Sequence, residues 1–410
     1  MNNKSKEIKT IDKIKKFCSY LTDWEEKKDY YVNDFLPQIM IPDFTGLSTE
    51  ERSLFLEIYR ETNAIEWKNL ISTIIYIKEH SSDSSKRISI ENPTNVEISQ
   101  SNFKRKFSEL NRKYGFEGFV HTTSFENFIK IMQDKILFSR NEIDRKNKHF
   151  NDIALQDVIE KTANPVSKYV RFYWRTKTPT NYTNEGLKPR TALIKNYSAH
   201  SALPVIMIFE PEIFLLNDKV FFTDKNAGTQ DFDIYRNVLD LDFKNIFNNK
   251  PKENFDLSEW NKIKKAMCSE ILFPTQISTR YIQKVIFRTE CDKERAQFIL
   301  GNNKNFTVDK NQFCNEWLYV DTYTYNQEKR KLEIFYHKGK KFNERYNLKS
   351  FSHKIQKVDS NNNLLEEKDC TSLVEKDVES LKIQLSKNNE AKFLIYYIDD
   401  IECLRVKLND

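Results

Sequence analysis

Hydrophobic residues follow a helical spacing over roughly the first quarter of the chain. They recur about one helical turn apart behind Ser48-Thr49-Glu50-Glu51, which has the spacing of a capping box. The positions in question are Leu54, Phe55, Ile58, Tyr59, Ile65, Leu70 and Ile71. Residues 81–86 are polar and favour a linker or an exposed loop. The pattern predicts a helical N-terminal extension over residues 1–110, with one long helix or two short ones.

The pattern changes from residue 116, where short apolar runs begin to alternate with short helical segments. Ser124 stands where an N-cap is expected, before a helix through Phe128 and Met132 that ends near Lys135. Strands are expected at residues 119–121, 136–138, 168–174, 203–209, 220–222 and 282–287. The run at 203–209 is apolar throughout, so we expect it to be a central strand. Interleaved helices and strands predict an α+β or α/β catalytic domain over residues 111–305.

A third pattern begins after about residue 305. Paired strands are expected at residues 317–320 and 331–336, a turn at 361–363, a helix at 374–385 and a strand at 393–397. We therefore expect a strand-rich α+β C-terminal extension over residues 306–410. It is either a small accessory domain or an edge extension of the main sheet.

Composition narrows the class of protein. Of the 410 residues, 39% are hydrophobic and 31% are charged with both signs mixed, which argues against general disorder. The formal net charge of +6 permits a nucleic-acid partner without proving one. The cysteines are widely spaced, which argues against a zinc site and a disulfide framework. No apolar run approaches the roughly 20 residues of a membrane span, so we expect a cytoplasmic protein with no membrane partner.

One carboxylate stands out chemically. Residues 267–274 read Met-Cys-Ser-Glu-Ile-Leu-Phe-Pro, so Glu270 lies against an apolar, strand-type run that a proline closes. Burying an unpaired carboxylate costs on the order of several kcal/mol of folding free energy, unless the group takes up a proton. Glu270 should therefore either face a cleft or form a surface salt bridge at a strand edge.

Four segments in the middle of the chain resemble the DarT family, toxins that ADP-ribosylate bases in single-stranded DNA. The first is Val-His-Thr-Thr-Ser-Phe-Glu-Asn at residues 120–127, followed by Leu-Phe-Ser-Arg-Asn at 137–141. The second is Tyr-Val-Arg-Phe-Tyr-Trp at 169–174, similar to the family's Tyr-Val-Pro-Phe-Tyr-Phe. The third is Phe-Thr-Asp-Lys-Asn-Ala at 222–227, and the fourth is Ser-Glu-Ile-Leu-Phe-Pro at 269–274. The resemblance covers about residues 116 to 290.

The resemblance implies an α+β fold with the split β-sheet of ADP-ribosyltransferases and an NAD co-substrate, with no metal. Cleavage of NAD develops oxocarbenium character at the ribose, which a carboxylate stabilises. Glu270 is the candidate catalytic residue. By carry-over, His121 binds the ribose, Tyr173 stacks on nicotinamide, and Arg140 meets the diphosphate. The other cofactor-binding candidates are Thr123, Ser139 and Asn141. Alternatives remain: a core histidine for His121, ordinary strand packing for Tyr173, a solvated side chain for Arg140, and a plain turn for Ser139 and Asn141.

Two departures from the family pattern concern the target base. The arginine pair that precedes the Tyr-Val-Pro-Phe-Tyr-Phe strand in the family falls on Lys161 and Thr162, where Lys161 is a catalytic candidate. Lysine offers a point charge in place of a planar fork. Arg171 replaces the family's proline and, with Lys225 and Asn226, is a candidate nucleic-acid contact. Both changes leave the identity of the base, and DNA over RNA, open.

Basic residues also cluster outside these segments. Examples are Lys329-Arg330-Lys331 and residues 338–341, Lys-Gly-Lys-Lys, which flank Phe335 and Tyr336. Positive charge interleaved with aromatics is typical of single-strand binding, although solvated Lys-rich faces explain it equally well.

The sequence thus predicts a toxin-type enzyme that moves ADP-ribose from NAD to a base in single-stranded nucleic acid, DNA in the first place. A toxin–antitoxin or phage-defence system, with a protein antitoxin as partner, follows from the resemblance. The alternatives are an RNA-modifying transferase and an inactive nucleic-acid-binding protein on the same fold.

Overall fold

The computed structural model describes residues 93–148, 150, 166–189, 200–216, 220–228, 232–235, 238–375 and 378–408. Contacts divide the chain into two compact units, Met1–Ile98 and Ser99–Asp410. Helix α6 (Pro93–Tyr114) begins the described part, and the other described elements all belong to the second unit. The helical positions expected between residues 48 and 71, the linker expected at 81–86 and the Lys161-Thr162 pair lie outside the described residues.

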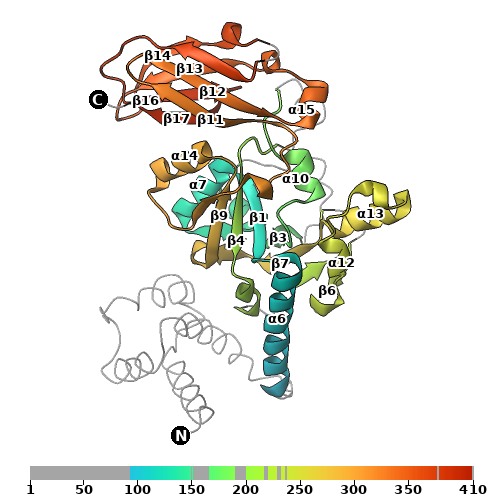
Figure 1. The fold of residues 1–410 in the computed structure, drawn as a ribbon. Coiled ribbons are helices and arrows are strands. Elements are labelled where there is room, and N and C mark those ends of the chain that lie inside the picture. Colours follow the sequence, from blue (N-terminus) through green and yellow to red (C-terminus); the bar gives the residue numbers. More distant parts are fainter. Residues whose placement is uncertain are drawn as a thin grey trace, which may run out of the picture. The chain divides into compact units, whose positions relative to one another are not determined.

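An eight-stranded sheet in the order β10-β9-β4-β1-β3-β7-β5-β6 forms the centre of this unit (Figure 1). Its strands are β1 (Phe119–Ser124), β3 (Tyr169–Tyr173), β4 (Pro204–Phe209), β5 (Phe221–Thr223), β6 (Ile234–Tyr235), β7 (Glu270–Pro274), β9 (Ile282–Phe287) and β10 (Phe306–Val308). All residues of β4 are buried, which fits the apolar run expected there. The α+β class and the central strand at 203–209 are confirmed.

The sheet opens between β1 and β3. Strand β1 pairs with β4 along its whole length, from Phe119↔Phe209 to Ser124↔Pro204. On its other side it pairs with β3 only at Val120↔Tyr173. Strands β3 and β7, by contrast, pair at every residue. The sheet is therefore split into two halves that touch at one point, as the resemblance implies.

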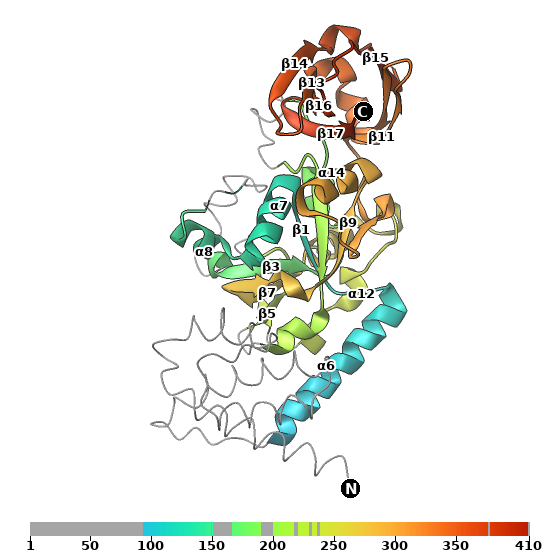
Figure 2. The same cartoon turned by 90° about the vertical axis from the view of Figure 1, so that its left-hand side faces the viewer.

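Two helices cover one face of the sheet beside the split. Helix α7 (Phe125–Asp134) begins at Ser124, whose hydroxyl accepts from the backbone N–H of Asn127, and ends at Lys135 with φ 58°. It packs against α14 (Glu290–Leu300), as Figure 2 shows. The expected cap and end of α7 are both confirmed. The other α-helices among the described residues are α8 (Arg140–Arg145), α10 (Pro179–Asn184), α12 (Phe243–Ile246), α13 (Leu257–Ala266) and α15 (Lys340–Arg345).

Short elements connect these parts. Strands β2 (Ile136–Phe138) and β8 (Gln276–Ser278) form a separate two-stranded sheet. Single 3-10 turns lie at Val166–Lys168, Pro211–Leu216, Val238–Asp240, Lys252–Asn254, Thr279–Tyr281, Lys310–Gln312, Leu348–Ser350 and Thr371–Leu373.

Of the strands in the expected C-terminal extension, β10 joins the edge of the central sheet, and the strands from residue 318 onward form two sheets of their own. A three-stranded sheet has the order β11-β12-β15 and a four-stranded sheet the order β14-β13-β16-β17. The strands are β11 (Leu318–Asn326), β12 (Lys331–Lys338), β13 (His353–Val358), β14 (Leu364–Asp369), β15 (Ser380–Gln384), β16 (Phe393–Ile398) and β17 (Ile401–Lys407). The expected pairing of β11 with β12 and the turn near Asn362 are confirmed.

The prediction of a helix at residues 374–385 is wrong. The segment instead ends in strand β15, which pairs with β12 from Lys331↔Gln384 to Phe335↔Ser380. Leu381 and Ile383 are buried while Lys382 and Gln384 are exposed. This alternation has the period of a half-buried strand, and the edge of β12 supplies the hydrogen bonds that a helix would make internally.

Aromatic side chains fill the centre of the central sheet. Phe119 meets Trp174 edge to face at a ring-centroid distance of 5.4 Å, and Phe172 meets Phe209 at 5.1 Å. All four are essentially buried. These side chains come from β1, β3 and β4 and from the residue that follows β3. Their packing therefore holds the strands that carry the site in position relative to one another.

Candidate active site

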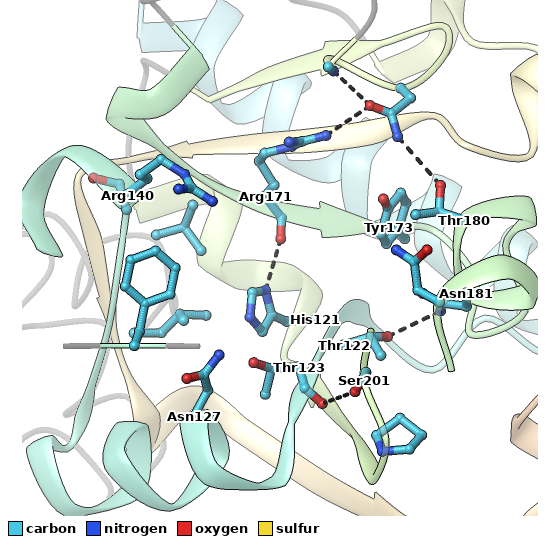
Figure 3. A pocket seen from close by; sticks show the side chains of 18 of the residues that line it. His121, Thr122, Thr123, Asn127, Arg140, Arg171, Tyr173, Thr180, Asn181 and Ser201 are labelled. Atoms are coloured by element: carbon cyan, nitrogen blue, oxygen red, sulfur yellow. Dashed lines mark hydrogen bonds between the residues drawn. The ribbon is translucent and has the colours of Figure 1, made fainter. Parts of the chain in front are cut away.

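A cavity of about 1120 Å³ opens beside the split between β1 and β3. Its walls come from β1, α7, β2, α8, β3, α10, α13 and the turn at residues 225–228 (Figure 3). Most of the side chains that the sequence singled out line it, namely His121, Thr123, Ser139, Arg140, Arg171, Tyr173, Lys225 and Asn226. Segments that are distant in sequence therefore meet in one space.

Three predicted residues are not among the lining side chains. Asn141 is exposed on α8 outside the cavity. Lys161 lies outside the described residues. Glu270 is fully buried and is not among the lining side chains, whereas its partner Arg171 is.

Glu270 and Arg171 form a two-pronged ion pair. Arg171 Nε donates to Glu270 Oε2 at 2.6 Å, and Arg171 Nη2 donates to Oε1 at 2.6 Å. The strand register explains the contact, because Tyr173 lies opposite Glu270 and Arg171 is two residues away on the same face of β3. The guanidinium side chain is 33% exposed while the carboxylate is 0% exposed. Arg171 thus stands between the carboxylate and the cavity.

The charge of Arg171 is maintained in this setting. Burial opposes the charged guanidinium, but attraction to Glu270 and the hydrogen bonds to it outweigh burial and raise the pKa of Arg171. The pKa of Tyr173 is also raised, first by burial and then by the negative charge of Glu270. Tyr173 therefore keeps its hydroxyl proton and presents an uncharged side chain at the cavity wall.

Asn226 is held by the same arginine. Its Oδ1 accepts from Arg171 Nη2 at 3.0 Å and from the backbone N–H of Gly228 at 2.7 Å. Its amide group donates to Thr180 Oγ1 at 3.5 Å. These contacts fix the orientation of the amide and tie the residue 222–227 turn to β3 and α10. In the same turn, Lys225 Nζ lies 3.4 Å from Asp224 Oδ2.

His121 bridges the split in the sheet. Its Nδ1 lies 3.0 Å from the backbone oxygen of Arg171, as Figure 3 shows. Burial lowers the pKa of His121, and the positive charge of Arg171 lowers it further, while the hydrogen bond to the Arg171 carbonyl raises it. A neutral ring whose Nδ1–H donates to that carbonyl leaves Nε2 as an acceptor facing the cavity.

Ser139 and Arg140 begin helix α8 at the far wall. The Ser139 hydroxyl caps the helix by accepting from the backbone N–H of Glu142 at 3.4 Å. The Arg140 guanidinium lies 5.1 Å from the ring centroid of Phe150. Figure 3 shows Arg140 directed into the space opposite Tyr173.

Helix α10 supplies wall residues that the sequence reasoning missed. Asn181 donates to Thr122 Oγ1 at 3.3 Å and to the backbone oxygen of Thr176 at 2.7 Å. Thr178 caps this helix, and Pro179 occupies its first turn. The Thr-Pro pair is an N-terminal helix signal, so it is the one clue that could have located the helix.

The described residues contain no group of three or more His, Cys, Asp or Glu side chains placed to hold a metal ion. In the same part of the chain, no helix combines the length and apolarity that crossing a bilayer requires.

Comparison with known protein families gives a match for the part of the chain that includes the central sheet. Residues 120–319 match the family described as "ssDNA thymidine ADP-ribosyltransferase, DarT". No curated protein matches the chain.

Solved structures with a matching portion include two of Thermus sp. 2.9 DarT. The complex with NAD⁺ is 15% identical with a TM-score of 0.35 and covers 48% of this chain and 96% of that chain. The complex with ADP-ribosylated ssDNA is 15% identical with a TM-score of 0.38, and the match covers 48% of this chain and 95% of that chain. Thermosipho africanus DarTG in complex with ADP-ribose is 19% identical with a TM-score of 0.38, and the match covers 48% of this chain and 51% of that chain.

Proposed function

We propose that this chain, which carries a DarT domain over residues 120–319 and is by that domain an NAD-dependent ADP-ribosyltransferase, transfers ADP-ribose from NAD to thymidine in single-stranded DNA. The observation that carries the proposal is the ion pair of buried Glu270 with Arg171, whose guanidinium faces the cavity that His121 and Tyr173 also line. The cavity volume of about 1120 Å³ slightly exceeds the range of about 300–1,000 Å³ typical of ligand pockets. It suits a dinucleotide.

NAD lies along this cavity in the proposal. The acceptor Nε2 of His121 meets a ribose hydroxyl, and the neutral ring of Tyr173 stacks on nicotinamide. Arg140, opposite Tyr173, meets the diphosphate, for which a guanidinium fork is suited. Thr123 and Ser139 line the same cavity, whereas Asn141 is exposed and is not among the lining side chains. No metal takes part.

The reaction exchanges one bond at the ribose for another. The bond from the ribose anomeric carbon to nicotinamide breaks, and nicotinamide leaves with the bonding electrons. The anomeric carbon becomes oxocarbenium-like, which the Glu270 carboxylate stabilises. A ring nitrogen of the thymine forms the new bond and releases its proton to that carboxylate. The base must be unstacked for this approach, which favours a single strand.

Arg171 has to yield before Glu270 can act. Its guanidinium fork can bind a phosphate through two hydrogen bonds, as it binds a carboxylate. We propose that an incoming strand draws Arg171 away and uncovers the carboxylate beside the ribose. In this account Arg171, Lys225 and Asn226 contact the nucleic acid, and Lys161 takes the place of the family's arginine pair as a catalytic residue.

The biological setting follows from the same resemblance. The chain would act as a toxin in a toxin–antitoxin or phage-defence system, restrained by a protein antitoxin. The Thermosipho africanus neighbour is a DarTG protein.

Labelled NAD and a panel of oligonucleotides test the proposal. Single strands of DNA with and without thymidine, the corresponding duplex and an RNA strand are incubated with the full chain. Label should appear on the thymidine-containing DNA strand and not on the duplex. Label on RNA alone would make the enzyme an RNA transferase, and label on no nucleic acid would reject the proposal.

A further inference from the structure

Helix α10 presents an aromatic ring at the rim of the cavity. Tyr182 is 40% exposed, although its neighbours Asn181 and Thr183 both line the cavity. An aromatic ring exposed to this degree beside a ligand cavity offers a flat face to solvent. It lies next to the place where the proposed strand would enter.

A lysine from the C-terminal segment lies over this ring. Lys341 Nζ of α15 is 3.5 Å from the centroid of Tyr182 and 3.4 Å from its backbone oxygen. The same ammonium is 5.7 Å from the ring centroid of Trp317. Helix α15 begins at Lys340, beyond residue 319 where the family match ends. This contact therefore comes from a part of the chain that the DarT domain does not include.

Further positive charge surrounds the pair. Lys264 and Lys265 of α13 are exposed and line the cavity. Burial lowers the pKa of Lys341, Glu316 opposes this, and the positive charges of Arg345 and Lys264 lower it further. Positive side chains of α13 and α15 therefore lie close enough to repel each other, which is the arrangement that an anionic strand would relieve.

Acidic groups contribute to the same surface. Glu316 and Glu344 both raise the pKa of Tyr182, after the larger effect of burial. Glu316 is partly buried, with one carboxylate oxygen fully covered. Glu344 is exposed, but so are Lys264, Lys265 and Arg345, so basic side chains outnumber acidic ones among the exposed residues here.

The aromatic partner of the basic run at residues 338–341 differs from the one that the sequence suggested. Tyr336 is buried and bonds through its hydroxyl to Tyr396 at 2.6 Å, so it belongs to the core of the C-terminal sheets. The aromatic partner of Lys341 is instead Tyr182, which lies 159 positions earlier in the chain. Basic and aromatic groups thus meet at the rim only in the folded chain.

We propose that Tyr182, Lys341, Lys264 and Lys265 form a binding surface for single-stranded nucleic acid at the rim of the cavity. A base next to the modified one stacks on Tyr182, and Lys341 and the α13 lysines contact its phosphates. Sequence-tolerant stacking combined with positive charge is the usual means of holding a single strand. The inference rests on the proposed function, because the surface continues the path of the strand that the cavity modifies.

Fluorescence anisotropy of a labelled DNA single strand tests the surface. The full chain is titrated without NAD, so that no transfer occurs, into a strand of about 16 nucleotides, the upper site size of a single-strand binding fold. Tyr182→Ala should weaken binding about tenfold or more, the size of one base–aromatic stack. Lys341→Ala should weaken it too and reduce the slope of log affinity against log salt by about 0.7, the value for one phosphate contact on a single strand.

Matched variants separate this role from a structural one. Tyr182→Phe keeps the ring and Lys341→Arg keeps the charge, so both should bind close to wild type. Lys368→Ala removes an exposed lysine on β14 and should change nothing. Thermal unfolding of each variant shows whether the fold is retained.

The outcomes also separate this inference from the proposed function. If folded Tyr182→Ala and Lys341→Ala bind the strand as tightly as wild type, the surface is rejected, while transfer of ADP-ribose to thymidine by the wild type would leave the function standing. If the wild type binds the strand but modifies no base, the function fails and the surface is judged by the variants alone. A wild type that binds no strand overturns both.

Discussion

At the scale of single residues, the ion pair of Arg171 with Glu270 is the central feature. The sequence left two alternatives for Glu270, a cleft or a surface salt bridge, and the structure adopts neither. The carboxylate is buried and its charge is met by an arginine that faces the cavity. The partners are 99 residues apart, so their contact depends on the register of β3 against β7, which a single sequence does not reveal.

Removing the arginine should cost stability. Arg171→Ala leaves a buried carboxylate without its cation, and we expect the free energy of unfolding to fall by up to about 3 kcal/mol, since breaking a buried pair costs about 3–5 kcal/mol and Arg171 is partly exposed. Chemical denaturation measures the change. Arg145→Ala is the matched control, because the Arg145–Glu142 pair has an arginine that is 65% exposed and should contribute about 1 kcal/mol or less. Equal losses in the two variants would contradict the account.

The imidazole of His121 should stay neutral at physiological pH. Burial and the nearby Arg171 charge hold the pKa of His121 below its ordinary value of 6.5. Affinity for NAD should therefore be constant as pH falls from 8 to 6.5, and the neutral form should persist below that. NMR titration of the ring signal, assigned through His121→Asn, measures the midpoint directly. A midpoint above 6.5 would mean that the ring is not buried as described.

The sign of the linked stability follows from the same shift. Because the folded pKa of His121 is lowered, the unfolded chain takes up a proton first as pH falls through 6.5. The contribution of His121 to stability is therefore fully present above pH 6.5 and is lost as pH falls toward the folded pKa.

At the scale of elements, local signals predicted the segments beside the site well. Ser124 and the apolar positions behind it were enough to predict α7, because an N-cap and an amphipathic stripe are local properties. The segment at residues 374–385 failed for the opposite reason, since its strand exists only through pairing with β12. The split between β1 and β3 was likewise known only from the resemblance, because nothing local shows that two strands pair at one point.

Strand β1 should not tolerate a side chain where it begins. A Cβ at Gly118 would lie 2.2 Å from the backbone oxygen of Phe209 and 2.9 Å from Ile208 Cγ2, atoms of the adjacent strand. Gly118→Ala should therefore lower the free energy of unfolding by about 1–3 kcal/mol, as overpacking usually does. Ser108→Ala, at an exposed helix position, is the control. An unfolding midpoint equal to wild type would show that β1 and β4 are not packed as described.

At the scale of the whole molecule, the C-terminal segment completes the packing of the central sheet. Buried Glu185 accepts from the backbone N–H groups of Cys314 at 2.7 Å and Asn315 at 2.9 Å. Arg288 lies between the rings of Phe313 and Tyr319, with centroid distances of 5.0 and 4.6 Å. Composition and local pattern located a change near residue 305 but gave no sign of these contacts, which join residues far apart in the chain.

A chain that ends after Asp309 should therefore fold poorly. Truncation leaves Glu185 and Arg288 without these partners, and it uncovers Leu187, whose N–H donates to the backbone oxygen of Leu318 at 2.9 Å. We expect little soluble protein and no cooperative thermal transition. The buried Glu185–Arg288 ion pair, 3.3 Å apart, would lose its backbone donors and covering rings, and a buried pair without its further hydrogen bonds costs several kcal/mol against a domain stability of about 5–15 kcal/mol. A truncated chain that unfolds cooperatively near the wild-type temperature would show that the segments are independent.

The central claim is that Glu270 drives transfer of ADP-ribose to thymidine, and nucleoside mass spectrometry tests it most directly. Single-stranded DNA is incubated with NAD and the full chain, digested to nucleosides and analysed for modified thymidine. The wild type should yield ADP-ribosylated thymidine, and folded Glu270→Gln should lower its rate by about 10²-fold or more, the usual size of such a contribution. A Glu270→Gln variant that modifies thymidine as fast as the wild type would contradict the account.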